Sequence, residues 1–244
     1  MSERPHKLTI EITKGTILLF AVFLVIGYFI GGTFPPSNFT GAAKESNVVI
    51  QQQPQQVQQQ TVKFQIPSFA PSKGSDSAQF NIVEFGDYQC PFCEKFFQQV
   101  EPHIKQDYID TGKVKFYFLD FQFLGPDSET LGQGAWCAND QGKYYDYHDY
   151  VYSHQGQENS GWATPDKVKT LAANILELDL QKFNSCLDSK KYETLVQQLT
   201  GLGKKLGVSG TPAVFMGNDQ KGYISVVGAQ PYDVFKQVID KQMS

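Results

Sequence analysis

The chain of 244 residues is 41% hydrophobic, 14% aromatic and 19% charged, and its formal net charge is −4. These values are ordinary for a globular fold, and the length is enough for one domain with a sizeable core. Basic residues form no cluster beyond the first few positions, so the sequence gives no support for a nucleic-acid partner and we set that class aside.

An apolar run without any charged residue extends over residues 15–32. It is long enough to cross a bilayer, and no A-x-A site follows it, so we predict a retained transmembrane anchor rather than a cleaved signal peptide. Basic residues in the tail, residues 1–14, outnumber Lys44 on the other side. This predicts a single-pass protein of the cell membrane with a cytoplasmic amino terminus and an extracytoplasmic domain in an oxidising compartment.

Residues 33–60 follow the predicted anchor and are rich in Gln, with several Pro and small polar residues. Their apolar content is too low to build a core, so we expect a flexible tether. Asn38 lies in an N-x-S/T acceptor triplet within this segment. Such triplets arise often by chance, and whether Asn38 is glycosylated stays open.

Residues 82–93 read IVEFGDYQCPFC and combine the end of a strand with the start of a helix. Apolar side chains occupy both faces of the strand predicted over residues 79–87, which is typical of a central strand. After the cysteines, apolar residues recur at helical spacing to about Thr111. Cys90 therefore lies at the start of the helix and Cys93 one turn inside it, close enough for a reactive disulfide.

The start of a helix changes the chemistry of the first cysteine. Unpaired N–H groups and the helix dipole stabilise an anion there, so we predict a lowered pKa for the Cys90 thiol. Pro91 suits the first helical position because its missing N–H costs nothing there. Phe92 offers only its backbone N–H, which predicts a milder lowering than a histidine would give. We expect Cys90 to be exposed and to meet the substrate, while the deeper Cys93 resolves the mixed disulfide.

Two further strands flank this segment. Residues 62–66 alternate as a first strand, and residues 113–123 are almost continuously apolar, which indicates a central position in the sheet. A strand, a helix and a strand at this spacing form a parallel βαβ unit.

The stretch 126–206 has helical patterns and is too long for a simple crossover. Thr164 and Asp179 are the predicted N-caps of two of its helices. The chain then closes with three predicted elements, which are strands at 213–216 and 224–227 and a helix after Pro231.

The segment 82–93 resembles the active-site strand and motif of DsbA-like members of the thioredoxin superfamily. A second stretch far downstream, residues 207–212, reads GVSGTP and matches the loop that carries this family's cis-proline. The resemblance covers about residues 61–242 and implies a protein disulfide oxidoreductase. It also implies that Thr211 and Pro212 bind the extended backbone of a substrate beside the cysteines.

The fold implied by this resemblance is an α/β thioredoxin fold with an inserted helical domain, here preceded by the single predicted transmembrane helix. Residues 61–125 would form the first part of the thioredoxin fold with the CxxC motif. Residues 126–206 would form the helical insertion, and residues 207–244 the second part with the cis-proline loop.

Glu84 is a further candidate for the site. It lies on the same strand face as Phe80 and Ile82, so burial should raise the pKa of its carboxyl. The resemblance matches it to a buried acid that relays a proton to or from Cys93. The alternative is a glutamate at a strand end that a nearby lysine or water satisfies.

The other two cysteines, Cys137 and Cys186, both fall in the predicted insertion. Some DsbA-like proteins carry a second, structural disulfide there, and two nearby thiols pair in an oxidising compartment. We therefore predict a structural disulfide between them. Two buried free thiols are the alternative.

A single CxxC also occurs in zinc sites, which need four ligands. The sequence has no second CxxC and no closely spaced Cys/His pair, so we predict no metal site and no cofactor other than the redox-active disulfide. A copper- or zinc-binding module of the same fold stays the alternative from another class. It would need a third ligand facing the cysteines, and we assign no such role to His103, His148 or His154.

The resemblance implies unfolded or extended secreted proteins as substrates. It also implies a membrane quinone-linked reoxidant of the DsbB or VKOR kind as a partner. Oxidation of substrate cysteine pairs is the expected direction, and a reductase or isomerase of the same fold is the alternative.

Overall fold

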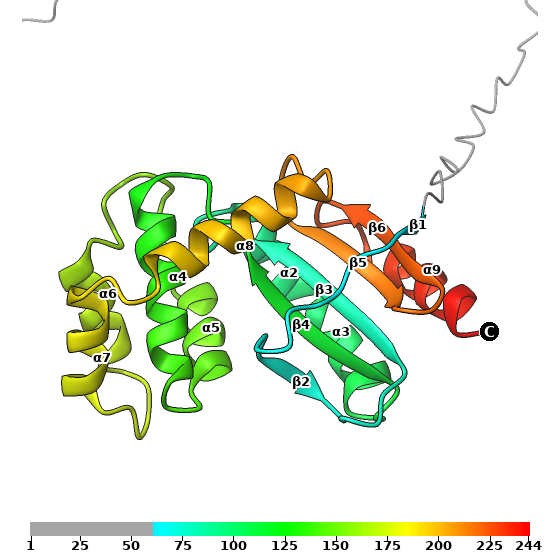
Figure 1. Ribbon diagram of the computed structural model, residues 1–244, viewed down its shortest axis with the longest axis horizontal. Helices are drawn as coiled ribbons and strands as arrows, with labels where there is room; N and C mark the ends of the chain where they lie inside the picture. The colour runs from blue at the N-terminus through cyan, green and yellow to red at the C-terminus, as the bar shows by residue number, and fades with distance from the viewer. Residues whose placement is uncertain (1–60) are drawn as a thin grey trace, which may run out of the picture. The chain divides into compact units, whose positions relative to one another are not determined.

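The structure is a computed structural model and describes residues 61–244. Within this range six strands form one sheet in the order β1-β6-β5-β3-β4-β2 (Figure 1). The strands are β1 (Thr61–Val62), β2 (Ser72–Gly74), β3 (Phe80–Gly86), β4 (Val114–Asp120), β5 (Ala213–Asn218) and β6 (Gly222–Val227).

The predicted tail, anchor and tether, residues 1–14, 15–32 and 33–60, lie outside the described residues. In the part of the chain that is described, no helix has the length and apolar content needed to cross a membrane.

The centre of the sheet is β3, which runs parallel to β4 and antiparallel to β5. All its residues except Asn81 are buried, because helices cover both faces of the sheet. The predicted parallel βαβ unit is therefore confirmed. Its second strand ends at Asp120, three residues earlier than predicted.

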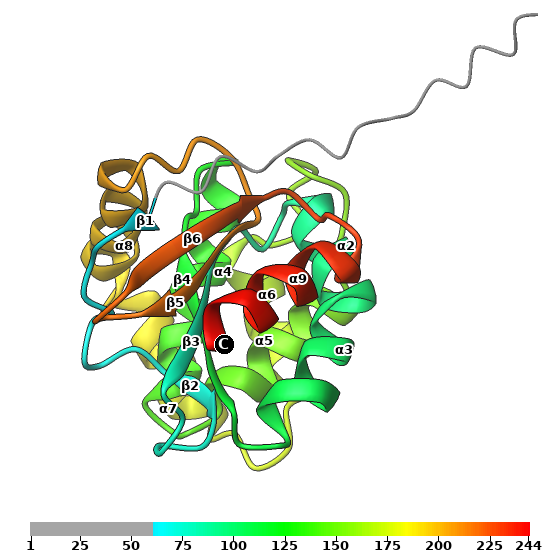
Figure 2. The ribbon, with the colours of Figure 1, turned by 90° about the vertical axis from the view of Figure 1, so that its right-hand side faces the viewer.

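The helices α2 (Pro91–Gln99), α3 (Glu101–Ile104) and α9 (Tyr232–Met243) lie on one face of the sheet, as Figure 2 shows. The prediction of one continuous helix from the cysteines to Thr111 is wrong. The helix breaks at Val100, and a π-helical turn, η1 (Lys105–Ile109), follows α3. Pro102 explains the break, because it has no N–H to continue the hydrogen bonds of α2.

The first two strands also differ from the prediction. The alternation over residues 62–66 predicted a longer strand, but β1 has only two residues. Phe64 packs on the core from outside the strand, with its ring 4.6 Å from that of Tyr223. The edge strand β2 was not predicted, since its sequence, Ser-Lys-Gly, has no apolar alternation, and it is held by antiparallel pairing with β4.

The insertion consists of α4 (Pro126–Asn139), α5 (Tyr144–Ser153), α6 (Pro165–Ala172) and α7 (Leu180–Asp188), which lie together beside one end of the sheet (Figure 1). Asp179 caps α7, as predicted, by accepting hydrogen bonds from two backbone N–H groups. Thr164 is the N-cap residue of α6, but its side chain makes no capping bond, so that part of the prediction is wrong.

The last helix before the chain re-enters the sheet is α8 (Glu193–Lys205). It packs directly on the sheet, because Gly203 allows a close approach. A Cβ atom at Gly203 would lie 2.5 Å from the Phe121 ring and 3.0 Å from the Phe85 ring. The helix thus covers the face opposite to α2 and α9 (Figure 2).

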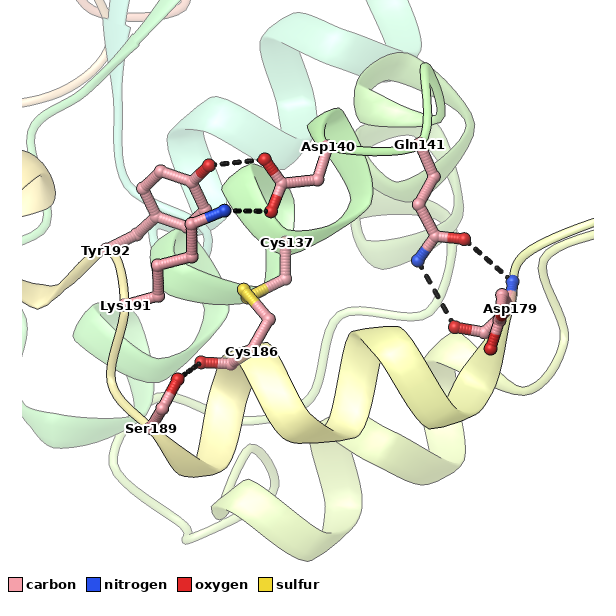
Figure 3. Close-up of a disulfide and its surroundings, with 8 residues drawn as sticks. All are labelled: Cys137, Asp140, Gln141, Asp179, Cys186, Ser189, Lys191 and Tyr192. Carbon is pink, nitrogen blue, oxygen red and sulfur yellow. Dashed lines mark hydrogen bonds and ion pairs between the residues drawn. A yellow bond between two sulfur atoms is a disulfide. The ribbon is translucent and has the colours of Figure 1, made fainter.

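A disulfide joins Cys137 of α4 to Cys186 of α7, with 5.8 Å between their Cα atoms (Figure 3). Two polar contacts near it also connect the ends of these helices. Lys191 Nζ lies 2.6 Å from Asp140 Oδ2, and the Gln141 side chain exchanges hydrogen bonds with the backbone of Asp179. An open pocket of about 650 Å³ beside the bridge is lined by neither the CxxC segment nor the cis-proline loop.

We expect the bridge to stabilise the insertion. It closes a loop with a sequence separation of 49 residues, and a loop of that length corresponds to about 4 kcal/mol in the chain-entropy model. The double substitution Cys137→Ala and Cys186→Ala should lower the free energy of unfolding by roughly that amount in urea titrations. Unchanged stability of the double variant would show that packing alone holds α4 and α7 together.

Candidate active site

The two cysteines of the CxxC motif lie where the sequence predicts. Cys90 is the N-cap residue of α2, and Pro91 occupies the first turn. The Cys90 carbonyl accepts hydrogen bonds from the N–H groups of Cys93 and Glu94, at 3.0 and 3.1 Å. Both residues are free thiols. The expectation that Cys90 is exposed is wrong, because it is only 6% exposed, against 0% for Cys93.

The two cysteines of the pair differ in the pKa of their thiols. A hydrogen bond from the Cys93 thiol lowers the pKa of Cys90 to about 6, and the backbone N–H groups of Cys93 and Phe92 add to this while burial opposes it. The sequence predicted the direction but attributed it to the helix start. The larger contribution comes from the second cysteine itself.

Cys93 has the opposite character. Burial raises its pKa well above the usual value, and the hydrogen bond to Cys90 and the charge of Glu84 act in the same direction. At neutral pH the reduced pair therefore carries a thiolate on Cys90 and a proton on Cys93. A sulfur that is already an anion is both the nucleophile and the better leaving group in thiol–disulfide exchange.

The loop before β5 lies against Cys90. The Thr211–Pro212 peptide bond is cis, and the Cys90 thiol lies 3.4 Å from the Thr211 carbonyl oxygen. The Gly228 N–H donates to the Pro212 carbonyl at 2.8 Å, which fixes this loop to the end of β6. The structure thus brings Thr211 and Pro212 beside the CxxC motif, although 121 residues separate Cys90 from Thr211.

Glu84 lies beneath the cysteines on β3 and is 1% exposed. Burial raises the pKa of its carboxyl well above the usual value, the charges of Glu101 and Cys90 raise it further, and a hydrogen bond from the Cys93 thiol opposes this. Its Oε1 atom has no hydrogen-bond partner among the described residues. Glu84 is thus a buried acid in contact with Cys93, and the lysine near it, Lys73, hydrogen-bonds to Glu101 instead.

A buried acid that the sequence reasoning missed holds the segment before the cysteines. Asp87 is fully buried, and each of its carboxylate oxygens accepts two hydrogen bonds. The donors are the N–H of Gln89 and the hydroxyl of Ser128 on one oxygen, and the N–H groups of Phe123 and Leu124 on the other. Asp87 therefore joins the active-site loop to the loop that follows β4. The sequence signal that could have identified Asp87 is its position within the segment 82–93, three residues before Cys90.

The insertion also contacts the active-site segment directly. Gln155, just after α5, donates from Nε2 to the carbonyls of Tyr88 and Cys90, at 2.9 and 3.2 Å. The Asn159 N–H donates to Gln89 Oε1 at 2.8 Å. No sequence signal could have found these contacts, since the partners are 65 to 70 residues apart and belong to no motif.

Two apolar side chains near the reactive sulfur face solvent. Phe92 is 58% exposed, and so is Val227. Val227 pairs across the sheet with Ala213, the residue after Pro212. The surface around the CxxC motif and the cis-proline loop therefore offers apolar contacts to another molecule.

No group of three or more His, Cys, Asp and Glu residues within residues 61–244 could hold a metal ion. The three histidines of this range pack on aromatic rings. His148 is fully buried, with its ring 4.8 Å from that of Phe118, while His103 and His154 stack on Tyr232 and Tyr150.

A thiolate at the start of a helix, with a protonated partner thiol one turn inside and a cis-proline against it, is the reactive centre of a thiol–disulfide oxidoreductase. The fold around it is the thioredoxin fold with a helical insertion. This class needs no cofactor beyond the cysteine pair.

Comparisons with known proteins agree with this class. The family model described as Thioredoxin matches residues 68–241. The probable disulfide bond formation protein D of Bacillus anthracis is 32% identical, over 70% of this chain and 77% of that protein. Disulfide bond formation protein D of Bacillus subtilis is 29% identical, over 71% and 77% of the two chains.

Two solved structures are also similar. Oxidised BdbD from Bacillus subtilis has a TM-score of 0.67 and 28% identity, covering 75% of this chain and 98% of that one. The α-DsbA1 of Wolbachia pipientis has a TM-score of 0.64 and 25% identity, covering 73% and 92%. The chain therefore belongs to the DsbA-like disulfide oxidoreductases of the thioredoxin family, and it is a protein disulfide oxidoreductase.

We expect the ultraviolet absorbance of the thiolate to titrate with a midpoint near the pKa of about 6 at Cys90. Cys93→Ala should raise this midpoint, because it removes the thiol that donates to Cys90. Alkylation at mildly acidic pH should label Cys90 before Cys93. A midpoint above about 8, near that of a free cysteine, would contradict the assignment.

The same titration has a consequence for stability. The folded pKa of Cys90 lies below the unfolded value of about 8.5, so its contribution to stability is complete above that value and is lost as pH falls through about 6. The stability of the reduced protein, relative to the oxidised protein, should therefore rise between these pH values. Thermal unfolding of both forms at several pH values measures it.

Proposed function

We propose that the protein oxidises cysteine pairs in other proteins, outside the cytoplasm. The observation that carries this direction is the thiolate of Cys90, whose pKa is lowered to about 6 by the hydrogen bond from Cys93. A stabilised thiolate makes the reduced enzyme the favoured form, so the disulfide form readily takes two electrons from a substrate. Similarity to proteins named for disulfide bond formation supports the same direction.

The reaction begins with the Cys90–Cys93 disulfide. A substrate thiolate attacks the Cys90 sulfur, which forms a mixed disulfide and breaks the bond to Cys93. The expelled Cys93 thiolate is buried, and a proton from the Glu84 carboxyl neutralises it. The second thiol of the substrate then loses its proton to solvent and attacks the first substrate sulfur, which is bonded to Cys90 in the mixed disulfide. Cys90 leaves as a thiolate, and two electrons have passed from the substrate to the enzyme.

The substrate in this proposal is an unfolded or extended chain of a secreted or membrane protein. Its backbone would pair with the loop at Thr211 and Pro212, which lies against the reactive sulfur. Apolar side chains of the substrate would contact Phe92 and Val227. Because these two side chains are exposed on the surface, they can contact many different substrate sequences. This arrangement predicts broad specificity.

A reductase or an isomerase would use the same residues. We favour the oxidase because its reaction ends in the reduced pair that the Cys93 hydrogen bond stabilises. A copper- or zinc-binding module would need further ligands at the cysteines, and no such group is present among residues 61–244.

The location and the reoxidant belong to the proposal as well. The uncharged apolar run at residues 15–32 supports a membrane anchor, and the excess of basic residues before it supports an extracytoplasmic catalytic domain. An oxidase at that position needs a partner that returns its electrons to the membrane. The resemblance to DsbA-like proteins points to a quinone-linked membrane protein of the DsbB or VKOR kind.

The variant Cys93→Ala tests the mechanism. Without the resolving thiol, substrates should accumulate as mixed disulfides on Cys90, which non-reducing gels and mass mapping detect. Cys90→Ala is the matched control and should abolish both trapping and oxidation of a reduced peptide. If Cys93→Ala traps nothing while Cys90→Ala still traps, the roles of the two cysteines are reversed.

Protease added to intact cells tests the location. The catalytic domain should be degraded, and the protein should stay with membranes after washing at high salt. A soluble mature chain that begins after residue 32 would show a cleaved signal instead of an anchor. Protection of the domain in intact cells, with loss of protection on lysis, would overturn the extracytoplasmic location.

A further inference from the structure

A charged cluster lies on the sheet face that carries Glu84, because Lys73 pairs with Phe116, and Phe116 pairs with Ile82, two residues before Glu84 on β3. Lys73 of β2 lies between two carboxylates from separate elements, with its Nζ 2.9 Å from Glu101 Oε1 of α3 and 2.9 Å from Asp149 Oδ1 of α5. Asp149 also contacts His148 Nδ1 at 2.8 Å. The side chain of Asp149 is 46% exposed, whereas that of Glu101 is 5% exposed.

Glu101 is buried although its hydrogen bonding is incomplete. Lys73 already has a partially exposed partner in Asp149, and the second oxygen of Glu101, Oε2, has no hydrogen-bond partner among the described residues. Removing a carboxylate from water costs several kcal/mol, and an ion pair with one unpaired oxygen recovers little of it. Glu101 therefore pairs its negative charge with Lys73 in a buried position while one of its carboxyl oxygens stays unpaired.

That charge acts on the buried acid of the active site. Glu101 raises the pKa of Glu84 after the larger effect of burial, and Lys73 partly offsets it. Each of the two carboxyls has one oxygen without a partner. The titratable groups around Glu84 are Cys90 and Cys93 of the α2 segment, Glu101 of α3, Lys73 of β2, and Tyr144, Tyr145 and Tyr152 of α5.

We propose that Glu101 is a positioning residue for the proton of Glu84, with its own charge held in place by Lys73. The proposal rests on the proton transfer from Glu84 to Cys93 described above. Before the reaction, the negative charge of Glu101 disfavours a second carboxylate beside it, so Glu84 keeps its proton. When Cys93 is expelled, the O–H bond of Glu84 breaks and the S–H bond of Cys93 forms.

The negative charge of Glu101 also favours the return of a proton to Glu84 after the reaction. After the transfer, two buried carboxylates lie on one side of the sheet, and their repulsion favours the return of a proton to Glu84. The ion pair with Lys73 holds the charge of Glu101 in place at the same time. The cluster therefore directs the proton to the carboxyl that contacts Cys93.

The test is a titration of Glu84 in the folded, reduced protein, by NMR of carbon-13-labelled glutamate carboxyls assigned with Glu84→Gln. Glu101→Gln removes the negative charge and keeps the shape, so the midpoint of Glu84 should fall by about one to two pH units. Glu101→Asp keeps the charge and should restore most of the midpoint. Asp149→Asn removes the other carboxylate from the same lysine and should leave the midpoint of Glu84 in place.

An unchanged Glu84 midpoint in Glu101→Gln, or an equal fall in Asp149→Asn, would overturn the proposal. The wild-type protein gives a second criterion that needs no variant to fold, since the Glu84 resonance must show the protonated form at neutral pH. An ionised Glu84 at neutral pH would also overturn it. These titrations involve no substrate, so they remain decisive whether or not the protein proves to be an oxidase.

The pH profile of peptide oxidation is a further test, because a purely structural role of Glu101 would not shift the profile along the pH axis. The alkaline limb of the rate, where Glu84 loses its proton, should shift to lower pH in Glu101→Gln and return in Glu101→Asp. A Glu101→Gln profile that loses rate equally at every pH would indicate a structural defect and contradict the proposal.

Discussion

The interaction of the Cys93 thiol with the Cys90 sulfur is the one on which the chemistry of this protein depends. It lowers the pKa of one cysteine and raises that of the other, so that a pair of identical groups acquires two roles. The geometry comes from the helix, because a spacing of three residues places the second sulfur one turn inside α2, behind the first. The break between β3 and α2 then puts Cys90 at the helix start, where backbone N–H groups add to the effect.

The surrounding structure keeps this pair in place and supplies its proton. Asp87 ties the segment before the cysteines to the loop after β4, and Gln155 connects it to the insertion. Burial of Cys93 and Glu84 disfavours charge on either group, so a thiolate expelled at Cys93 and a carboxyl that holds a proton become matched partners. The insertion therefore contributes to the site as well as covering the end of the sheet. The pocket beside its own disulfide is lined by neither the CxxC segment nor the cis-proline loop.

Much of the fold and site could be predicted because the signals are local. The motif around Cys90 contains a buried strand, a helix start and the spacing of the pair, and the loop at Pro212 identifies the family together with it. The break at Val100 also had a signal, since Pro102 stands in the sequence. Other features had none. The strand β2 is only Ser-Lys-Gly and is held by pairing with β4. The contacts of Gln155 and those of Lys73 join residues that only the folded chain brings together.

The reduction potential of the Cys90–Cys93 pair tests the central claim most directly. Equilibration of the purified protein with glutathione buffers of known ratio gives the value. If the hydrogen bond from Cys93 stabilises the Cys90 thiolate as the structure indicates, the potential should be well above the thioredoxin value of about −270 mV, and Cys90 variants that cannot form the pair should show no redox transition. A potential at or below about −270 mV would contradict the account, because the disulfide would then be the stable form and the protein would act as a reductant.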